Sequence, residues 1–149
     1  MNEKQFRILL VEDDAALSFI VKDNLEKNNY AVVVAENGDI ALDLYRSTSP
    51  DLIILDIMLP KRDGFQVAGI IRKNDEKIPI IFLTARSMTE DKITGLTIGG
   101  DDYITKPFSL EELLLKIRIF LKRSSAFPLP EIESGRKKIR IGIFEFLPE

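Results

Sequence analysis

Three carboxylates, one hydroxyl and one ammonium stand where short apolar runs end in this chain of 149 residues. The carboxylates cannot lie together uncompensated, because two like charges about 4 Å apart repel by roughly 4 kcal/mol at an effective dielectric near 20. A divalent cation or a proton must balance them, and Mg²⁺ prefers such hard oxygen ligands. The carboxylates belong to Glu12, Asp13 and Asp56, the hydroxyl to Thr84 and the ammonium to Lys106.

The chemistry that these side chains could perform together is the receipt of a phosphoryl group. Asp56 would be the nucleophile or acceptor, and Glu12 and Asp13 would hold the cation. The hydroxyl of Thr84 and the ammonium of Lys106 would stabilise the added charge. Taken singly, each residue has a structural explanation as a helix N-terminal acid, a cap or a salt-bridge partner. Only the combination favours phosphoryl chemistry, and no Gly-rich phosphate loop follows the first apolar run.

The elements that must position these residues are five apolar runs, which alternate with stretches of helical period. The runs are apolar at almost every position, which is typical of a parallel sheet covered on both faces. This alternation predicts an α/β fold, a flavodoxin-like (βα)5 doubly wound parallel sheet with strand order 2-1-3-4-5. The ends of the first and third strands then meet at the switch point. The predicted strands cover 7–11, 31–35, 51–55, 79–83 and 102–105, and the predicted helices 15–28, 38–48, 64–74, 90–98 and 109–123.

A short polar residue stands before each predicted helix and is its expected N-cap. Ser109 is followed three residues later by Glu112, which is the spacing of a capping box. The expected caps are Asp14, Asn37, Asp63, Thr89 and Ser109.

Composition excludes several classes of function. The chain has no Cys and no His, which rules out disulfides, Ser-His-Asp or Cys-His catalysis and His-ligated metal sites. A net charge of −3 argues against nucleic-acid binding by bulk electrostatics. No apolar run approaches the roughly 18 residues of a membrane span, and the polar start MNEKQFR lacks a signal-peptide pattern. We therefore expect no membrane association and a cytoplasmic location.

The character of the chain changes after Arg123, so we predict a domain over residues 5–123 and a linker over 124–136. The linker contains Pro, Ser and Gly in the stretch SSAFPLPEIESG. Within residues 137–149, Ile139, Ile141 and Ile143 alternate with Arg140 and Gly142, and Phe144 and Phe146 flank Glu145, which indicates a strand. A lone strand is not independently stable, so it either pairs with a partner chain or opens a second domain that is cut off here.

In combination, the motifs ILLVEDD, DLIILDIMLPKRDGF, PIIFLTA and GGDDYITKPF resemble the receiver domain of two-component response regulators over residues 5 to about 123. The resemblance implies that Asp56 accepts a phosphoryl group from a phosphohistidine on a sensor histidine kinase. It also implies a Mg²⁺ ion held by Glu12, Asp13, Asp56 and the backbone carbonyl of Met58.

The resemblance further implies a conformational switch. Lys106 would pair with the phosphoryl oxygens, and the Thr84 hydroxyl would hydrogen-bond one of them. The loop after the fourth strand would then move inward, and Tyr103 would rotate to fill the space behind it. A half-buried strand residue with its hydroxyl in water is the simpler explanation of Tyr103. The Lys106–Pro107 bond is usually cis in this family.

The C-terminal half of the chain resembles the OmpR/PhoB subfamily, whose receivers dimerise through the fourth helix, fifth strand and fifth helix. By position, Lys92 would pair with Glu112 and Asp102 with Lys116 across a two-fold axis. Because Lys lacks the bidentate fork of Arg, Lys116 predicts a weaker dimer than is usual. In this subfamily a winged-helix domain binds DNA and controls transcription, and KKIRIGIFEF resembles its opening strand. Contact with DNA would then require a domain mostly absent from this chain.

Two other functions compete with a phosphorylation switch that is not an enzyme. The first is a stand-alone receiver that signals by protein contact, with the tail as a docking strand. The second is a metal-dependent phosphatase with an aspartyl nucleophile. Such phosphatases generally carry a second Asp two residues after the nucleophile, and Met58 stands there in this chain.

Overall fold

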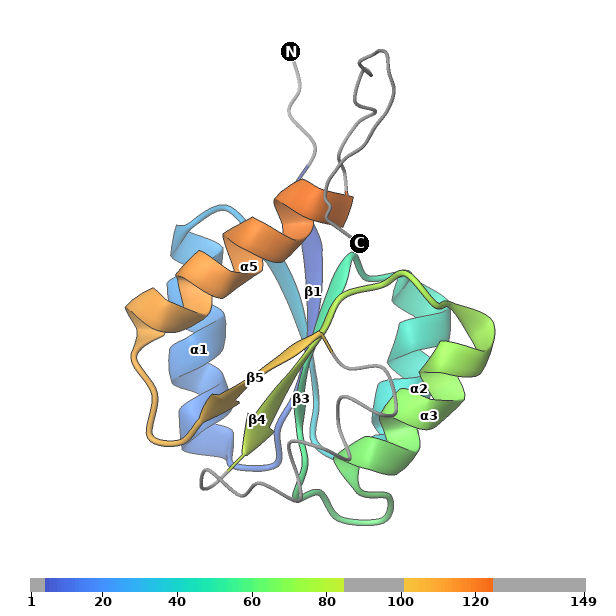
Figure 1. Cartoon of the computed structure of the whole chain (residues 1–149). Helices are drawn as coiled ribbons and strands as arrows, with labels where there is room; N and C mark the ends of the chain where they lie inside the picture. The colour runs from blue at the N-terminus through green and yellow to red at the C-terminus, as the bar shows by residue number, and fades with distance from the viewer. Residues whose placement is uncertain (1–4, 85–100, 125–149) are drawn as a thin grey trace, which may run out of the picture.

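The computed structural model describes residues 5–84 and 101–124 of the chain, and these fold around one parallel sheet (Figure 1). The sheet has five strands in the order β2-β1-β3-β4-β5, which confirms the predicted flavodoxin-like topology. All four strand pairs are parallel. The strands are β1 (Arg7–Val11), β2 (Ala31–Ala35), β3 (Leu52–Asp56), β4 (Ile80–Thr84) and β5 (Asp102–Thr105).

Two of the strands begin and end one residue later than the sequence predicts. β3 and β4 were expected over 51–55 and 79–83, so the difference lies in their last residues, Asp56 and Thr84. Asp56 pairs with Leu83 in the β3–β4 ladder, and Thr84 pairs with Thr105 in the β4–β5 ladder. Both polar residues therefore belong to the rigid sheet and not to the loops that follow it.

Within the described residues four helices surround the sheet, and a predicted side-chain cap begins each of them. Asp14, Asn37 and Asp63 accept hydrogen bonds from backbone N–H groups in the first turns of their helices. Ser109 Oγ accepts from Glu112 N–H at 3.1 Å ahead of the last helix. The helices are α1 (Ala15–Lys27), α2 (Gly38–Thr48), α3 (Gly64–Asn74) and α5 (Leu110–Ser124). The helix predicted over 90–98, with its cap Thr89, lies outside the described residues.

Alternate residues of each strand enter two separate cores, one on each face of the sheet. In β1, Leu9 and Val11 pack with α2 and α3, whereas Ile8 and Leu10 pack with α1 and α5. Figure 1 shows α1 and α5 on one side of the sheet and α2 and α3 on the other. This double cover explains why the strands are apolar throughout, and it leaves polar side chains only at the strand ends.

The switch point lies where β1 and β3 run side by side, with Val11 opposite Leu55. The residues that follow these partners, Glu12 and Asp56, therefore emerge at the same edge of the sheet. Among the described residues, no helix is long and apolar enough to cross a membrane. The linker was predicted over 124–136, but Ser124 is the last residue of α5. The rest of the linker and the predicted tail over 137–149 fall beyond the described part, so these domain boundaries remain predictions.

Candidate functional site

A pocket of about 930 Å³ opens at the carboxyl end of the sheet, beside the switch point. Acidic residues and one lysine form one wall, and apolar residues of the loop between β3 and α3 and of the first turn of α3 form the other. The polar wall comprises Glu12, Asp13, Asp14, Asp56, Asp63 and Lys106, and the apolar wall Ile57, Met58, Leu59, Pro60 and Phe65.

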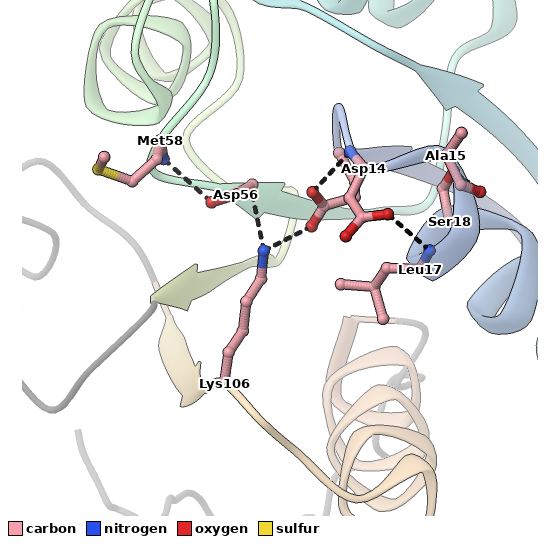
Figure 2. Close-up of polar contacts among 8 residues, drawn as sticks. Asp14, Ala15, Leu17, Ser18, Asp56, Met58 and Lys106 are labelled. Carbon is pink, nitrogen blue, oxygen red and sulfur yellow. Dashed lines mark hydrogen bonds and ion pairs between the residues drawn. The ribbon is translucent and has the colours of Figure 1, made fainter.

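Asp56 lies at the end of β3 with only 3% of its surface exposed. Its Oδ1 accepts a hydrogen bond from the Met58 N–H at 3.0 Å, and its Oδ2 accepts one from Lys106 Nζ at 2.9 Å (Figure 2). Both oxygens are thus held by donors, which fixes the carboxylate in one orientation. A buried carboxylate with this support is a suitable nucleophile for a phosphorus centre.

Glu12 follows β1 directly and is also buried. Its Oε1 accepts from Lys106 Nζ at 2.8 Å, and its Oε2 accepts from the Asp14 N–H at 3.0 Å. Burial raises the pKa of the Glu12 carboxyl, and the nearby Asp56 charge raises it further, although the hydrogen bonds from Lys106 and Asp14 oppose this rise. Burial therefore disfavours the ionised form of Glu12.

Lys106 follows the last residue of β5 and links the two buried carboxylates. Its backbone N–H donates to the Thr84 carbonyl at 2.6 Å, and its peptide bond to Pro107 is cis, as the resemblance implies. Figure 2 shows its side chain reaching to Asp56. Burial disfavours the ammonium, but the hydrogen bonds to Glu12 and Asp56 outweigh it and raise the pKa of Lys106. The side chain is therefore charged at neutral pH.

The residues present fit a divalent cation. Glu12, Asp13 and Asp56 each offer one carboxylate oxygen, and these three oxygens lie within 4.8 Å of one another. Asp13 is exposed, so this wall is open to solvent while its two acidic neighbours are buried. Such a set of hard donors with room for water suits Mg²⁺. For Met58 the structure shows a hydrogen bond from the N–H to Asp56, and the role of its carbonyl as a ligand remains a prediction.

Neither of the two predicted switch residues is among the residues that line the pocket. Thr84 is buried at the end of β4 and is not among the residues lining the pocket. Tyr103 is half-buried on β5, opposite Phe82, and packs against the core shared with α2 and α3. The roles of both residues in switching remain predictions.

The predicted dimer residues are partly described. Lys116 Nζ lies 2.6 Å from Asp102 Oδ2 within the same chain. Glu112 is exposed in the first turn of α5, and Lys92 falls outside the described residues. The expected partners Asp102 and Lys116 therefore meet inside one subunit, and their pairing across a dimer remains a prediction.

Sequence reasoning placed Met58 at the site through its carbonyl but did not predict that the apolar side chains after Asp56 form a wall of the pocket. It also did not predict how closely α3 approaches β3. A Cβ on Gly64 would lie only 2.4 Å from the Asp56 carbonyl oxygen. The dipeptide Asp63–Gly64 carried a signal, since a cap followed at once by glycine indicates a helix start pressed against another backbone. The N–H donors of Asp14 and Met58 left no signal, because backbone donors are the same at every non-proline position.

Comparison with known proteins bears directly on this pocket. A model of the family described as the response regulator receiver domain matches residues 8–118, a range that contains Glu12, Asp56 and Lys106. The transcriptional regulatory protein TrcR of Mycobacterium tuberculosis is 45% identical over 130 residues, which cover 87% of this chain and 51% of TrcR. The chain thus spans about half the length of the curated relatives it matches.

Solved structures agree with the sequence matches. The receiver domain of the Francisella response regulator 1452 is 38% identical with a TM-score of 0.76, over 80% of this chain and 99% of that one. The BeF3-activated DrrB receiver domain is 30% identical with a TM-score of 0.75, over 80% of this chain and 100% of that one. Because the family match covers most of the chain and the sheet order is the same as expected, the chain belongs to the response regulator receiver domain family.

Proposed function

We propose that Asp56 accepts a phosphoryl group from a phosphohistidine on a sensor histidine kinase, and that this modification switches the surface of the domain. One observation carries the proposal. The Asp56 carboxylate is buried at the pocket and oriented by the Met58 N–H and Lys106 Nζ, and two further carboxylates stand within 4.8 Å. Membership of the receiver family supports the same role.

In the transfer, an Asp56 oxygen forms a bond to phosphorus while the bond from phosphorus to the donor imidazole nitrogen breaks. The leaving imidazole takes up a proton, and Asp56 becomes an acyl phosphate. Lys106 already stands 2.9 Å from Asp56 Oδ2, so its ammonium is in place to compensate the incoming negative charge. A Mg²⁺ ion, held by Glu12, Asp13, Asp56 and the Met58 carbonyl, would supply further positive charge when bound.

The switch follows from a change of partners around the new phosphoryl group. Lys106 now divides its hydrogen bonds between Glu12 and Asp56, and a phosphoryl oxygen would compete for this ammonium. We propose that the Thr84 hydroxyl binds another phosphoryl oxygen and that Tyr103 rotates into the space behind it. The backbone bond from the Lys106 N–H to the Thr84 carbonyl supports this coupling, since it joins the ends of β4 and β5.

The proposed output is a homodimer formed by β5, α5 and the predicted helix over 90–98. In it, Lys92 would pair with Glu112, and Asp102 would exchange its own Lys116 for that of the second chain. One ion pair of the same kind replaces another, so this exchange adds little affinity. We propose that dimerisation controls transcription through a DNA-binding domain outside this chain, as the name of the relative TrcR suggests.

Two alternatives differ from this proposal in testable ways. A stand-alone receiver would be phosphorylated equally well but would act by protein contact alone, so a longer reading frame with a DNA-binding domain would exclude it. An aspartyl phosphatase would turn over phosphate esters repeatedly. Met58 lies two residues after Asp56 and has no proton to transfer, so we propose a switch and not an enzyme with external turnover.

The proposed function is tested by labelling the chain with a small acyl phosphate donor in the presence of Mg²⁺. Wild-type protein is expected to take up one phosphoryl group, and Asp56→Asn none, because an amide oxygen is a far weaker nucleophile than a carboxylate. A chelator should also prevent uptake. The matched control is Asp63→Asn, which alters another acid of the same pocket and keeps a good helix N-cap.

The outcome separates the candidate functions. Labelling of Asp63→Asn together with loss of labelling in Asp56→Asn supports the assignment. Unchanged labelling of Asp56→Asn contradicts it, and continuous release of phosphate from a generic ester by the wild-type chain would favour the phosphatase.

A further inference from the structure

The outward face of α5 combines exposed apolar residues with separated charges. Leu113, Ile117 and Leu121 are buried against the sheet. Because successive helical residues are 100° apart, Leu115 and Ile119 point to the opposite side, one turn from each other. Leu115 is 56% exposed and Ile119 is 42% exposed, so together they form a small apolar patch on the outward side of the helix.

Charged residues flank this apolar pair in a symmetrical order. Glu111 and Glu112 lie in the first turn of α5, and Lys122 and Arg123 lie in the last turn. Within the described part of the chain, none of these four forms a salt bridge. Arg123 instead stacks over the Phe120 ring at 5.2 Å. We call Glu111, Glu112, Leu115, Ile119, Lys122 and Arg123 the α5 outer face.

We propose that the α5 outer face binds a second copy of this chain, with the two α5 helices antiparallel about a two-fold axis that crosses the outer side of the helix at the level of residue 117. A two-fold contact requires a patch that is its own complement. Ile117 lies midway between Leu115 and Ile119, so the apolar pair of one copy meets the apolar pair of the other.

The charges select the same arrangement. In an antiparallel pair, the acidic first turn of one helix lies beside the basic last turn of the other, so Glu111 faces Lys122 and Glu112 faces Arg123 of the second copy. A parallel pair would instead place acids beside acids. The patch is small compared with a standard protein interface, so the association is weak and sensitive to salt.

This contact requires no phosphorylation, and its consequence for signalling rests on the proposed function. Glu112 is also the proposed partner of Lys92 in the activated dimer. One Glu112 carboxylate cannot serve both contacts fully, so the α5 pair competes with the activated dimer. The unphosphorylated chain is therefore held in an arrangement that differs from its output state.

The test is sedimentation equilibrium of the full, unphosphorylated 149-residue chain at low ionic strength over a range of concentrations. Glu111→Lys and Lys122→Glu are each expected to weaken association at least about tenfold, because each places like charges together twice in a two-fold pair. An equimolar mixture of the two variants should restore association, since each contact then joins opposite charges. Neither residue belongs to the proposed activated dimer.

Apolar substitutions provide an independent arm. Leu115→Ser should weaken association, whereas Phe19→Ser, on α1 and 71% exposed, should not. A wild-type chain that is monomeric at every concentration overturns the inference, and so does a mixture of the charge variants that stays monomeric. Association seen only after addition of beryllofluoride and Mg²⁺ would overturn it while leaving the proposed function intact.

Discussion

At the scale of single residues, Lys106 holds together two carboxylates that would otherwise repel each other. Its Nζ lies 2.8 Å from Glu12 Oε1 and 2.9 Å from Asp56 Oδ2. The ammonium thus occupies a bridging position between the acids before any phosphoryl group arrives. The charges of these residues do not balance, because Asp13 adds a third carboxylate beside the single ammonium of Lys106. This excess of negative charge is what favours a cation.

The first prediction concerns Glu12, whose pKa is raised mainly by burial. Glu12→Gln should increase the free energy of unfolding at neutral pH, because the amide avoids the cost of burying a charge and still offers an oxygen to Lys106. A carboxyl with a raised folded pKa destabilises the folded state above that pKa. The advantage of the variant should therefore shrink as the pH falls toward the unfolded value of 4.5. Urea denaturation at several pH values measures this difference.

Glu36→Gln is the matched control, since Glu36 follows β2 as Glu12 follows β1 but is exposed. This substitution should change the free energy of unfolding by no more than about 0.5 kcal/mol at every pH. A Glu12→Gln variant that is less stable than wild type at neutral pH would show that the bond to Lys106 outweighs desolvation.

The sequence was sufficient to predict Glu12, Asp56 and Lys106 as neighbours, because parallel strands must end at one edge of the sheet. It could not predict that Lys106 binds both acids at once, since that depends on side-chain reach and rotamer. The hydrogen bond from the Asp14 N–H to Glu12 also depends on the conformation of the turn after β1, which the sequence alone does not determine.

At the scale of elements, the start of α3 is pressed against the end of β3. The Gly64 N–H donates to the Ile57 carbonyl at 2.9 Å, and a Cβ at Gly64 would lie 2.8 Å from the Ile57 Cα. The helix therefore supports the backbone that carries Asp56. Its first turn is further fixed by the capping box between Asp63 and Gln66.

The second prediction compares two glycines of this helix. Gly64→Ala should destabilise the fold by about 1–3 kcal/mol, because a new methyl group must displace the backbone at Asp56 and Ile57. It should also slow phosphoryl uptake. Gly69→Ala is the matched control, since a Cβ there meets nothing within 4 Å. The free energy of unfolding of this control should rise by about 0.5–1 kcal/mol, because Ala has a higher helix propensity than Gly. Its uptake of a phosphoryl group should equal that of the wild type.

Thermal and urea unfolding measure the two stabilities, and labelling with the small donor measures uptake. Equal stability of Gly64→Ala and the wild type would contradict the close packing at the end of β3.

The elements themselves were largely predictable. The apolar runs predicted five strands of a parallel sheet that is covered on both faces, because the runs are apolar at almost every position. The predicted order of these strands came from the flavodoxin-like fold and is the observed one. The ends of β3 and β4 were less predictable. Their final residues, Asp56 and Thr84, are polar, and period and polarity alone placed both outside the ladder that they complete.

At the scale of the whole molecule, the same charged pair can be satisfied within one chain or between two. Asp102 and Lys116 are 2.6 Å apart in the single chain, and each is only partly exposed. Our proposed dimer exchanges this pair between subunits. The subfamily resemblance predicts these two residues as partners across a two-fold axis, whereas the structure pairs them within one chain. Both arrangements join the same two side chains, so the pairing between chains remains a prediction.

The third prediction separates the two cases by charge reversal. Asp102→Lys and Lys116→Asp should each prevent dimerisation in beryllofluoride and Mg²⁺, because like charges then meet. In a mixture of the two variants, every contact between subunits joins opposite charges, whereas every contact within a chain stays repulsive. We expect the mixture to dimerise, as measured by sedimentation velocity.

The double variant Asp102→Lys/Lys116→Asp is the control, since it restores the pair in both arrangements and should dimerise by itself. Recovery in the double variant without recovery in the mixture would show that the pair acts only within one chain.

Phosphorylation of Asp56 can be tested by locating the modified residue in the chain. Borohydride reduces an aspartyl phosphate to homoserine, and peptide mass spectrometry then locates the altered position after treatment of the wild-type chain with an acyl phosphate donor and Mg²⁺. We expect homoserine at position 56 and at no other acid of the pocket. Homoserine at Asp13 or Asp63, or a chain that carries none after treatment, would contradict it.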